Sequence, residues 1–475
     1  MGVSGHIIAM NIGGAKVTKA YFNGQLVFGP DSSATSVNNL CFSSSSKFTV
    51  QANFNSVNAM PYGMEDPSGS MSSDSSMATS SKLEYSTDNS TWTECMTDSI
   101  TAVKDTSDKK YKVYFRGTGG EVVGRTFVYT GNSDCTVSGS VLSLLDYKTV
   151  DSGDEPELGA ECFEALFSGM DKLVSADFEL PSLVVPEKGY YNMFTGCTAL
   201  ETPPKISAEE VGASGMKDMF YNCSAMTEAQ DELYIKTIDE SGCEEMYANC
   251  SGLTKLPTLV NQMKLTGASA LQNMFNGCSV ADNGDALYVS LKTTSENGCY
   301  GMFAHCGLTC GANITCTGAV AKSCFMNMYQ YCTSMTDGGS ITLGKQSCGE
   351  QAFSYMYYNC TALNTLPTFT GYKLGTAANQ CDGMFGNCSG LYQIWTFASF
   401  GAGITSLVST SVDSMFVHSA LTFYTSNNGT SQVYQFATSA SGVYSSVNLT
   451  PFFKVSSATQ QIYIPKSFTI ITLNG

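Results

Sequence analysis

The sequence predicts a β-rich α/β fold in four parts: an N-terminal β-hairpin, an antiparallel β-sandwich, a solenoid of stacked repeats and a β-rich C-terminal cap. Three observations lead to this prediction. A Met-aromatic-x-x-Cys motif recurs at nearly constant spacing through the middle of the 475-residue chain. Runs of alternating apolar and polar residues precede the repeats, and a β-rich segment without the motif follows them over residues 421–475.

The first 30 residues contain a hairpin signal. In "KVTKAYFNGQLVFGP" two apolar runs flank Asn23-Gly24, and this dipeptide favours the tight turn between two antiparallel strands. We therefore assign residues 1–30 to a separate N-terminal hairpin. The alternative, that this is simply the first hairpin of the following domain, stays open.

Residues 31–150 predict a small antiparallel sandwich of the immunoglobulin-like kind. The segments "KFTVQANF", "KLEYSTD", "KYKVYFRG" and "TFVYTG" alternate apolar and polar residues and are separated by turn signals. The acidic segment "DSGDEPELGAE" follows at residues 151–161. We interpret it as a solvated linker in preference to a calcium-binding loop, since short acidic runs are usually solvent-facing.

The repeat occupies the centre of the chain. The motif Met stands at positions 193, 219, 246, 274, 302, 328, 356, 384 and 415, and a degenerate copy, "LFSGM", precedes them. About ten units thus cover residues 162–420. The first unit has Met170 and the last has Ser419 in place of the Cys, as expected for the two capping units of a stack.

Each unit is predicted to contain a short helix, a bend and a strand. Cys381, Met384 and Phe385 have the i, i+3, i+4 spacing of one helix face. A Gly or Asn before the motif Cys tolerates a left-handed backbone and predicts the end of that helix. Six copies have Gly196, Asn222, Asn249, Gly277, Asn359 or Asn387 there, whereas His305, Tyr331 and His418 depart from the pattern. Short strands such as "ALYVSLK" and "GSITLGK" are expected to follow.

The motif side chains are predicted to form the interior of the stack, because one unit cannot bury its apolar face alone. Cysteine packs as a small hydrophobic residue, so we interpret its recurrence as packing between units, with a ladder of disulfides as the alternative. The predicted structural core comprises Met193, Phe194, Cys197, Met219, Phe220, Cys223, Met246, Tyr247, Cys250, Met274, Phe275, Cys278, Met302, Phe303, Cys306, Met328, Tyr329, Cys332, Met356, Tyr357, Cys360, Met384, Phe385 and Cys388.

No catalytic, metal or cofactor site is predicted. The three histidines are His6, His305 and His418, and neither of the last two has an adjacent carboxylate. The strongest zinc candidate, "HCGLTCGANITC" with His305, Cys306, Cys310 and Cys316, has looser spacing than known zinc ligand patterns. We therefore expect neither an enzyme nor a metalloprotein, and a polysaccharide-degrading enzyme is the least favoured function.

Charge and hydropathy exclude two classes of partner. Lys plus Arg number 24 against 41 Asp plus Glu, a formal net charge of −17. Such a chain repels the phosphates of nucleic acids and anionic membrane surfaces, and no segment has the 18 apolar residues of a membrane span. The first residues also lack the basic start and apolar run of a signal peptide, so folding in a cytoplasm is expected unless a leader precedes them.

The pattern "MF-x-x-C-(S/T)-x-L-x-x-x-P" resembles the BspA-type leucine-rich repeat of surface proteins of Bacteroidales and of virion proteins of their phages, including crAss-like phages. The segments "KLEYSTDNSTWTEC", "KKYKVYFRGTGG" and "VSGSVLSLLDY" are similar to the β-domain that precedes such repeats. The resemblance implies a leucine-rich-repeat solenoid that binds and displays. Short "YFNGxxV" hairpins are similar to those with which phage virion proteins dock onto the particle, which implies anchoring by Tyr21, Phe22, Asn23 and Gly24.

The expected function is therefore that of a structural virion protein: a phage head or tail fibre that is folded in the host cytoplasm and displayed on the virion surface. Its expected partners are other virion proteins, through the N-terminus, and a host surface glycan or protein, and a homo-oligomer is expected. The alternative is a bacterial cell-surface adhesin of the same repeat family. Candidate residues for stacking on sugar rings are Tyr190, Tyr191, Tyr221, Tyr300, Tyr331, Tyr358 and Tyr392, and the competing interpretation is that these rings fill gaps between turns.

Overall fold

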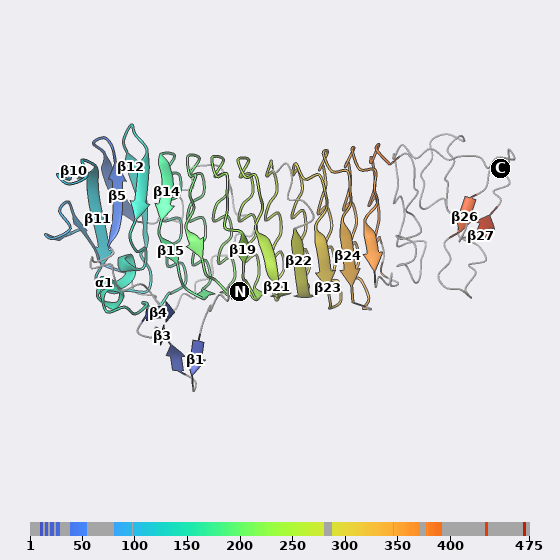
Figure 1. Cartoon of the computed structure of the whole chain (residues 1–475), viewed down its shortest axis with the longest axis horizontal. Coiled ribbons are helices and arrows are strands. Elements are labelled where there is room, and N and C mark those ends of the chain that lie inside the picture. The colour runs from blue at the N-terminus through green and yellow to red at the C-terminus, as the bar shows by residue number, and fades with distance from the viewer. Residues whose placement is uncertain are drawn as a thin grey trace.

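A computed structural model describes most of the chain. The described residues are 39–54, 80–96, 98–279, 287–344, 346–370, 377 and 379–391, with short strands near both termini. Two N-terminal sheets are followed by a β-solenoid of about seven turns over residues 179–370 (Figure 1). The solenoid prediction is thus confirmed at this level, whereas the leucine-rich-repeat identity stays a prediction. The tenth predicted unit, around Met415, lies outside the described residues.

The N-terminal sheets pack face to face. The larger has the strand order β14-β13-β5-β11-β7-β8, with β10 paired to β11, and the smaller has the order β12-β6-β9. Their strands are β5 (Leu40–Ser44), β6 (Thr49–Phe54), β7 (Leu83–Ser86), β8 (Thr93–Glu94), β9 (Ile100–Thr101), β10 (Val103–Lys104), β11 (Tyr111–Gly117), β12 (Arg125–Thr130), β13 (Cys135–Ser138) and β14 (Leu173–Asp177). Phe42 and Phe115 of the larger sheet meet Phe127 of the smaller, with ring centroids 5.0 and 4.8 Å from that of Phe127. The predicted antiparallel sheets are confirmed, and an immunoglobulin-like connectivity stays a prediction.

The sheets and the solenoid share one hydrophobic core. Strand β13 pairs in parallel with β14, which belongs to the first coil, and Phe127 stacks on Phe167 at 6.0 Å. Across the acidic segment predicted as a linker, Gly159 N–H donates to the Glu121 carbonyl. One buried cluster runs from Leu40 to Leu391. The sandwich therefore covers the first coil, and the buried core continues from one into the other.

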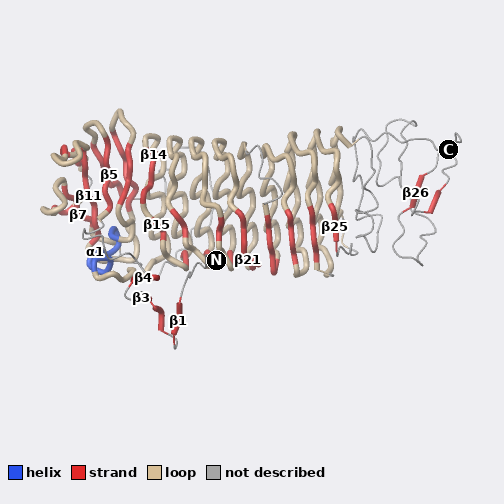
Figure 2. The backbone as a smooth tube through the Cα atoms, viewed as in Figure 1, coloured by secondary structure: helices blue, strands red, loops and turns tan. Residues whose placement is uncertain are grey.

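The solenoid strands lie along one side of the stack, with loops forming the rest of each coil (Figure 2). They are β15 (Glu179–Leu180), β16 (Val184–Val185), β17 (Lys205–Ile206), β18 (Glu210–Val211), β19 (Glu232–Leu233), β20 (Thr237–Ile238), β21 (Thr258–Leu265), β22 (Tyr288–Thr293), β23 (Asn313–Cys316), β24 (Ser340–Leu343) and β25 (Thr368–Thr370). All their pairings are parallel, and Val289, Ile314, Ile341 and Phe369 align on successive strands with buried side chains. The strands predicted in "ALYVSLK" and "GSITLGK" are β22 and β24.

The predicted short helix of each unit is wrong. The one α-helix among the described residues is α1 (Ser143–Asp151), before the solenoid, and none in that part of the chain has the length and apolar character of a membrane span. The motif segments are instead chains of turns. In the segment 241–250, alternate N–H groups donate to the carbonyl three residues back, and the intervening ones donate to the next coil, as from Tyr247 to Met274 and from Asn249 to Asn276.

A left-handed residue at every fourth position produces this turn chain. Ser241, Glu245 and Asn249 have φ angles of 51°, 53° and 60°. Each one reverses the local twist, so that alternate N–H groups point along the stack instead of into a helix. The left-handed backbone predicted before the motif Cys is confirmed in the described copies. His305 and Tyr331, which depart from the Gly-or-Asn sequence pattern, have the same left-handed backbone, with φ of 59° and 61°.

The terminal regions contain short antiparallel pairs. They are β1 (Met10–Ile12) with β2 (Ala15–Val17), β3 (Ala20–Phe22) with β4 (Gln25–Phe28), and β26 (Val433–Gln435) with β27 (Thr469–Ile471). Tyr21 and Phe22 lie in β3, which pairs with β4 as a hairpin requires. The turn residues Asn23 and Gly24 lie outside the described residues, as does most of the predicted cap at 421–475.

Candidate functional site: buried ladders and an exposed aromatic patch

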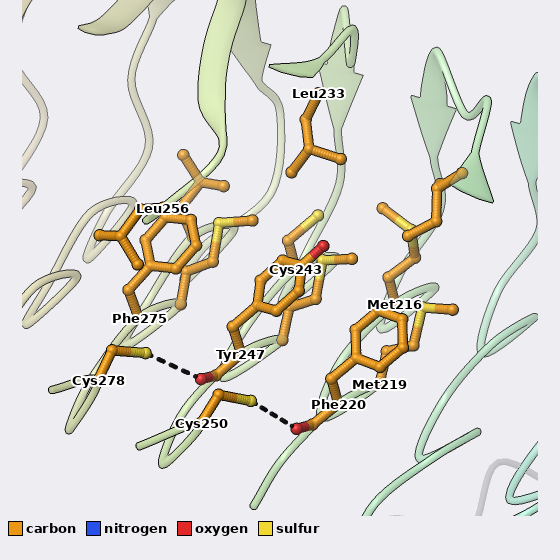
Figure 3. Packing of buried hydrophobic residues seen from close by; sticks show 14 of the residues in the cluster. Met216, Met219, Phe220, Leu233, Cys243, Tyr247, Cys250, Leu256, Phe275 and Cys278 are labelled. Atoms are coloured by element: carbon orange, nitrogen blue, oxygen red, sulfur yellow. Dashed lines mark hydrogen bonds between the residues drawn. The ribbon is translucent and has the colours of Figure 1, made fainter. Parts of the chain in front are cut away.

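The predicted motif residues form continuous ladders inside the solenoid (Figure 3). Each of the 24 is at most 2 % exposed. Their aromatic rings stack from coil to coil between Phe194 and Phe385, with neighbouring centroids 5.1–5.6 Å apart and planes within 21° of parallel. Stacked rings at this spacing add to the stabilisation from apolar burial.

The motif thiols have a second role besides packing. Each Sγ–H donates to the carbonyl of the motif aromatic residue in the preceding coil, at 2.9–3.2 Å. Figure 3 shows two such bonds, from Cys250 to Phe220 and from Cys278 to Tyr247. The Phe220 carbonyl also accepts the N–H of Cys223 in its own coil, so both of its lone pairs are used. Burial raises the pKa of Cys250 to about 12, which keeps the thiol protonated as a donor.

All nineteen cysteines are free thiols, and eighteen are buried. The residues of the zinc candidate do not converge on one point. Cys306 donates to the Phe275 carbonyl, Cys310 to Gly311 and Cys316 to Gly318, while the ring of His305 stacks on Tyr331. Within the described ranges, no group of three or more His, Cys, Asp or Glu side chains has an arrangement that could hold a metal ion.

Replacing Cys250 by alanine is expected to lower the free energy of unfolding by about 1–3 kcal/mol, because the change leaves a small void and removes one donor from the Phe220 carbonyl. Cys250→Ser should recover part of the loss, since its hydroxyl can donate to the same carbonyl. Urea unfolding midpoints measure both effects. Cys310→Ala, at a half-buried thiol outside the ladder, is the control with an expected change of about 0.5 kcal/mol. A serine variant no more stable than the alanine variant would assign the thiol to packing alone.

The candidate tyrosines occupy different environments. Tyr190 is fully buried and fills the interior, as the competing interpretation supposed. Tyr191, Tyr221 and Tyr300 are half-buried, and the Tyr300 hydroxyl accepts a hydrogen bond from Asn327 at 2.7 Å. Tyr392, with His6 and His418, lies outside the described residues.

Four aromatic side chains form a surface patch on three successive coils. The rings of His305 and Tyr331 stack with centroids 4.9 Å apart and planes 6° from parallel. Tyr358 meets Tyr331 edge-on at 6.0 Å and Tyr355 edge-on at 5.7 Å. We call these four residues the aromatic patch. His305 and Tyr331 are exposed, and Tyr355 and Tyr358 are half-buried. The patch is therefore the strongest candidate for recognition, because the ladders are inaccessible.

Two acidic residues, Asp218 and Glu245, lie on successive coils in the N-terminal half of the solenoid. Asp218 is 7 % exposed, and its Oδ1 has no hydrogen-bond partner. Its desolvation, together with the nearby carboxylates of Glu245 and Glu244, raises the pKa of Asp218 to about 7, and Lys217 offsets part of this effect. Lys217 itself forms an ion pair with Glu244 at 3.1 Å. Asp218 is thus a buried carboxyl group in the stack that titrates near neutral pH.

Compared with known proteins, the chain matches no family model, no curated protein and no solved structure.

Proposed function

We propose that the protein is a structural fibre protein of a phage head or tail, which displays its solenoid for attachment to host surface glycans. The observation that supports this proposal most is the single hydrophobic core from Leu40 to Leu391. A core without an interruption resists bending between the sandwich and the coils, as an elongated display element requires. The repeat resemblance and the terminal hairpin point to the virion as its location.

The arrangement of polar groups favours binding over catalysis. The motif side chains are buried, so each coil offers solvent mainly turns and one face of a short strand. Over the described coils, such a surface provides shallow contacts spread along the stack. Several copies on one particle would raise weak affinities by multivalency, by about 10²–10⁴ overall. In this proposal the hairpin around Tyr21 and Phe22 contacts other virion proteins, which leaves the coils available to the host surface.

Peptide mass spectrometry of density-purified phage particles tests the proposal. Peptides of this chain are expected to co-purify with the capsid proteins through the gradient and to stay with the particles after a high-salt wash. The washed envelope of uninfected host cells is the matched control fraction. Absence from particles would contradict the virion function, and recovery from the envelope of uninfected cells would favour the adhesin.

A further inference from the structure

Three aromatic residues of the aromatic patch have a left-handed backbone conformation. His305, Tyr331 and Tyr355 have φ angles of 59°, 61° and 55°, and they are the aromatic residues with left-handed φ in the described part of the chain. Most other non-glycine residues at the left-handed positions of the turn segments are Asn or Ser. Non-glycine residues other than Asn, Asp and His are uncommon in this region because the Cβ atom approaches the backbone, so Tyr331 and Tyr355 are the unusual residues here. The three residues occur on three consecutive coils.

At Tyr331, burial does not compensate for this strain. Tyr331 is 41 % exposed and His305 is also exposed, so neither ring contributes much to the core. Asn222 and Asn249 occupy the equivalent position in other coils with the same φ of 60°, which shows that the fold does not need a ring there. Strained residues that the fold does not require are typical of functional sites.

Neighbouring side chains hold the rings of the patch in place. Asn387 donates from Nδ2 to the Tyr358 hydroxyl at 2.8 Å, and the Tyr355 hydroxyl donates to Asp382 at 3.3 Å. Tyr358 in turn contacts both Tyr331 and Tyr355. The rings are therefore ordered before any ligand arrives, which lowers the entropic cost of binding.

The His305 ring at the end of the patch has a glycine beside it along the stack, on the side away from Tyr331. Backbone hydrogen bonds place Asn249, Gly277, His305 and Tyr331 at the same position of successive coils. Tyr331 covers one face of the His305 ring. Gly277, on the opposite side, has no side chain, and the Oδ1 of Asn249 reaches over it, 2.6 Å from where a Cβ would stand. The Asn249 amide thus occupies the space that a side chain at 277 would take, on the side of His305 away from Tyr331.

We propose that the aromatic patch binds a neutral oligosaccharide, whose sugar rings pack against the exposed rings of His305 and Tyr331. The apolar C–H face of a sugar suits an aromatic ring, and its hydroxyls suit an amide and the tyrosine hydroxyls, which can both donate and accept. A carboxylate, that of Asp382, contacts the patch at the Tyr355 hydroxyl and disfavours acidic sugars and nucleic acid. This inference rests on the proposed function and deepens it by naming the site and its ligand class.

Binding of the purified full chain to immobilised oligosaccharides tests the inference. The panel contains neutral glycans of glucose, mannose, galactose and N-acetylglucosamine, with sialylated and sulfated glycans and tyrosine-rich peptides for comparison. The wild-type chain should bind at least one neutral glycan. The double variant His305→Asn/Tyr331→Asn should weaken this binding about tenfold or more. Its thermal unfolding midpoint should be unchanged or higher, because asparagine is the residue that other coils use at this position.

Asn222→Gly is the matched control, since it changes the same position three coils before His305 and should leave binding unchanged. Equal binding by the double variant, or binding of only acidic glycans or peptides, would overturn the inference. Failure here is distinguishable from failure of the virion function. A chain found in particles whose patch binds no neutral glycan refutes the inference alone, and a glycan-binding chain absent from particles refutes the virion function alone.

Discussion

Replacing Phe275 by alanine is expected to lower the free energy of unfolding by about 3–5 kcal/mol. Phe275 is fully buried, and its ring lies between those of Tyr247 and Phe303, with both centroids 5.6 Å away. The substitution removes the apolar burial of one ring and two stacking contacts at once, and the neighbouring coils cannot close the gap, because hydrogen bonds between the turns fix their spacing.

Urea unfolding followed by circular dichroism measures this effect. Tyr288→Ala is the matched control, because it also removes an aromatic ring from a solenoid coil, but at a side chain that is 51 % exposed. We expect its change to be within about 0.5 kcal/mol. A loss below about 1 kcal/mol for Phe275→Ala would show that the aromatic ladder does not stabilise the stack.

Asp218→Asn is expected to stabilise the protein at pH 8 by about 2–4 kcal/mol and to have almost no effect at pH 4. The pKa of Asp218 is raised to about 7 in the folded protein, whereas an unfolded aspartate titrates at about 3.9. The folded state therefore binds the proton more tightly. Its contribution to stability is complete below pH 4 and is lost as the pH rises through 7. Asparagine mimics the protonated form, so it removes this loss.

Thermal unfolding midpoints of both proteins between pH 4 and pH 8 test this expectation. The difference between variant and wild type reports the titration of Asp218 together with its interaction with Glu245, whose pKa is also raised by burial. Asp231→Asn is the control, at a carboxylate that is 81 % exposed and paired only with Lys255, and should change stability little at any pH. A variant that is equally or less stable than the wild type at pH 8 would refute a buried, charged Asp218 in the folded state.

The sequence was sufficient to predict the stack and its interior. Met, aromatic and Cys side chains at steps of 26 to 28 residues can only be buried if equivalent positions lie side by side, and the ladders through Phe220 and Cys250 follow from this. The left-handed residue before the motif Cys was also predictable, because Gly and Asn favour that conformation. The prediction of a helix was wrong, because the i, i+3, i+4 spacing of Cys381, Met384 and Phe385 occurs equally in a chain of turns.

A signal for the turns was nevertheless present in the sequence. Residues that favour left-handed backbone recur at intervals of four, as in Ser214, Asp218 and Asn222, and a helix of this composition would be weak. The thiol hydrogen bonds left no such signal, since packing alone also selects cysteine. Of the aromatic patch, Tyr331 and Tyr358 were predicted as candidates and His305 was visible as a departure from the pattern, whereas Tyr355 was not predicted. The continuity of the patch depends on which coils become neighbours.

The repetition of identical contacts between coils has a genetic consequence. Because every turn segment offers the next one the same row of donors and acceptors, recombination between two similar stretches of the gene can add or delete a whole coil without a new kind of interface. The protein could thus change its reach in increments of one coil while the sandwich at its base stays the same. A lineage would then alter how far the aromatic patch stands from the base without altering the patch itself.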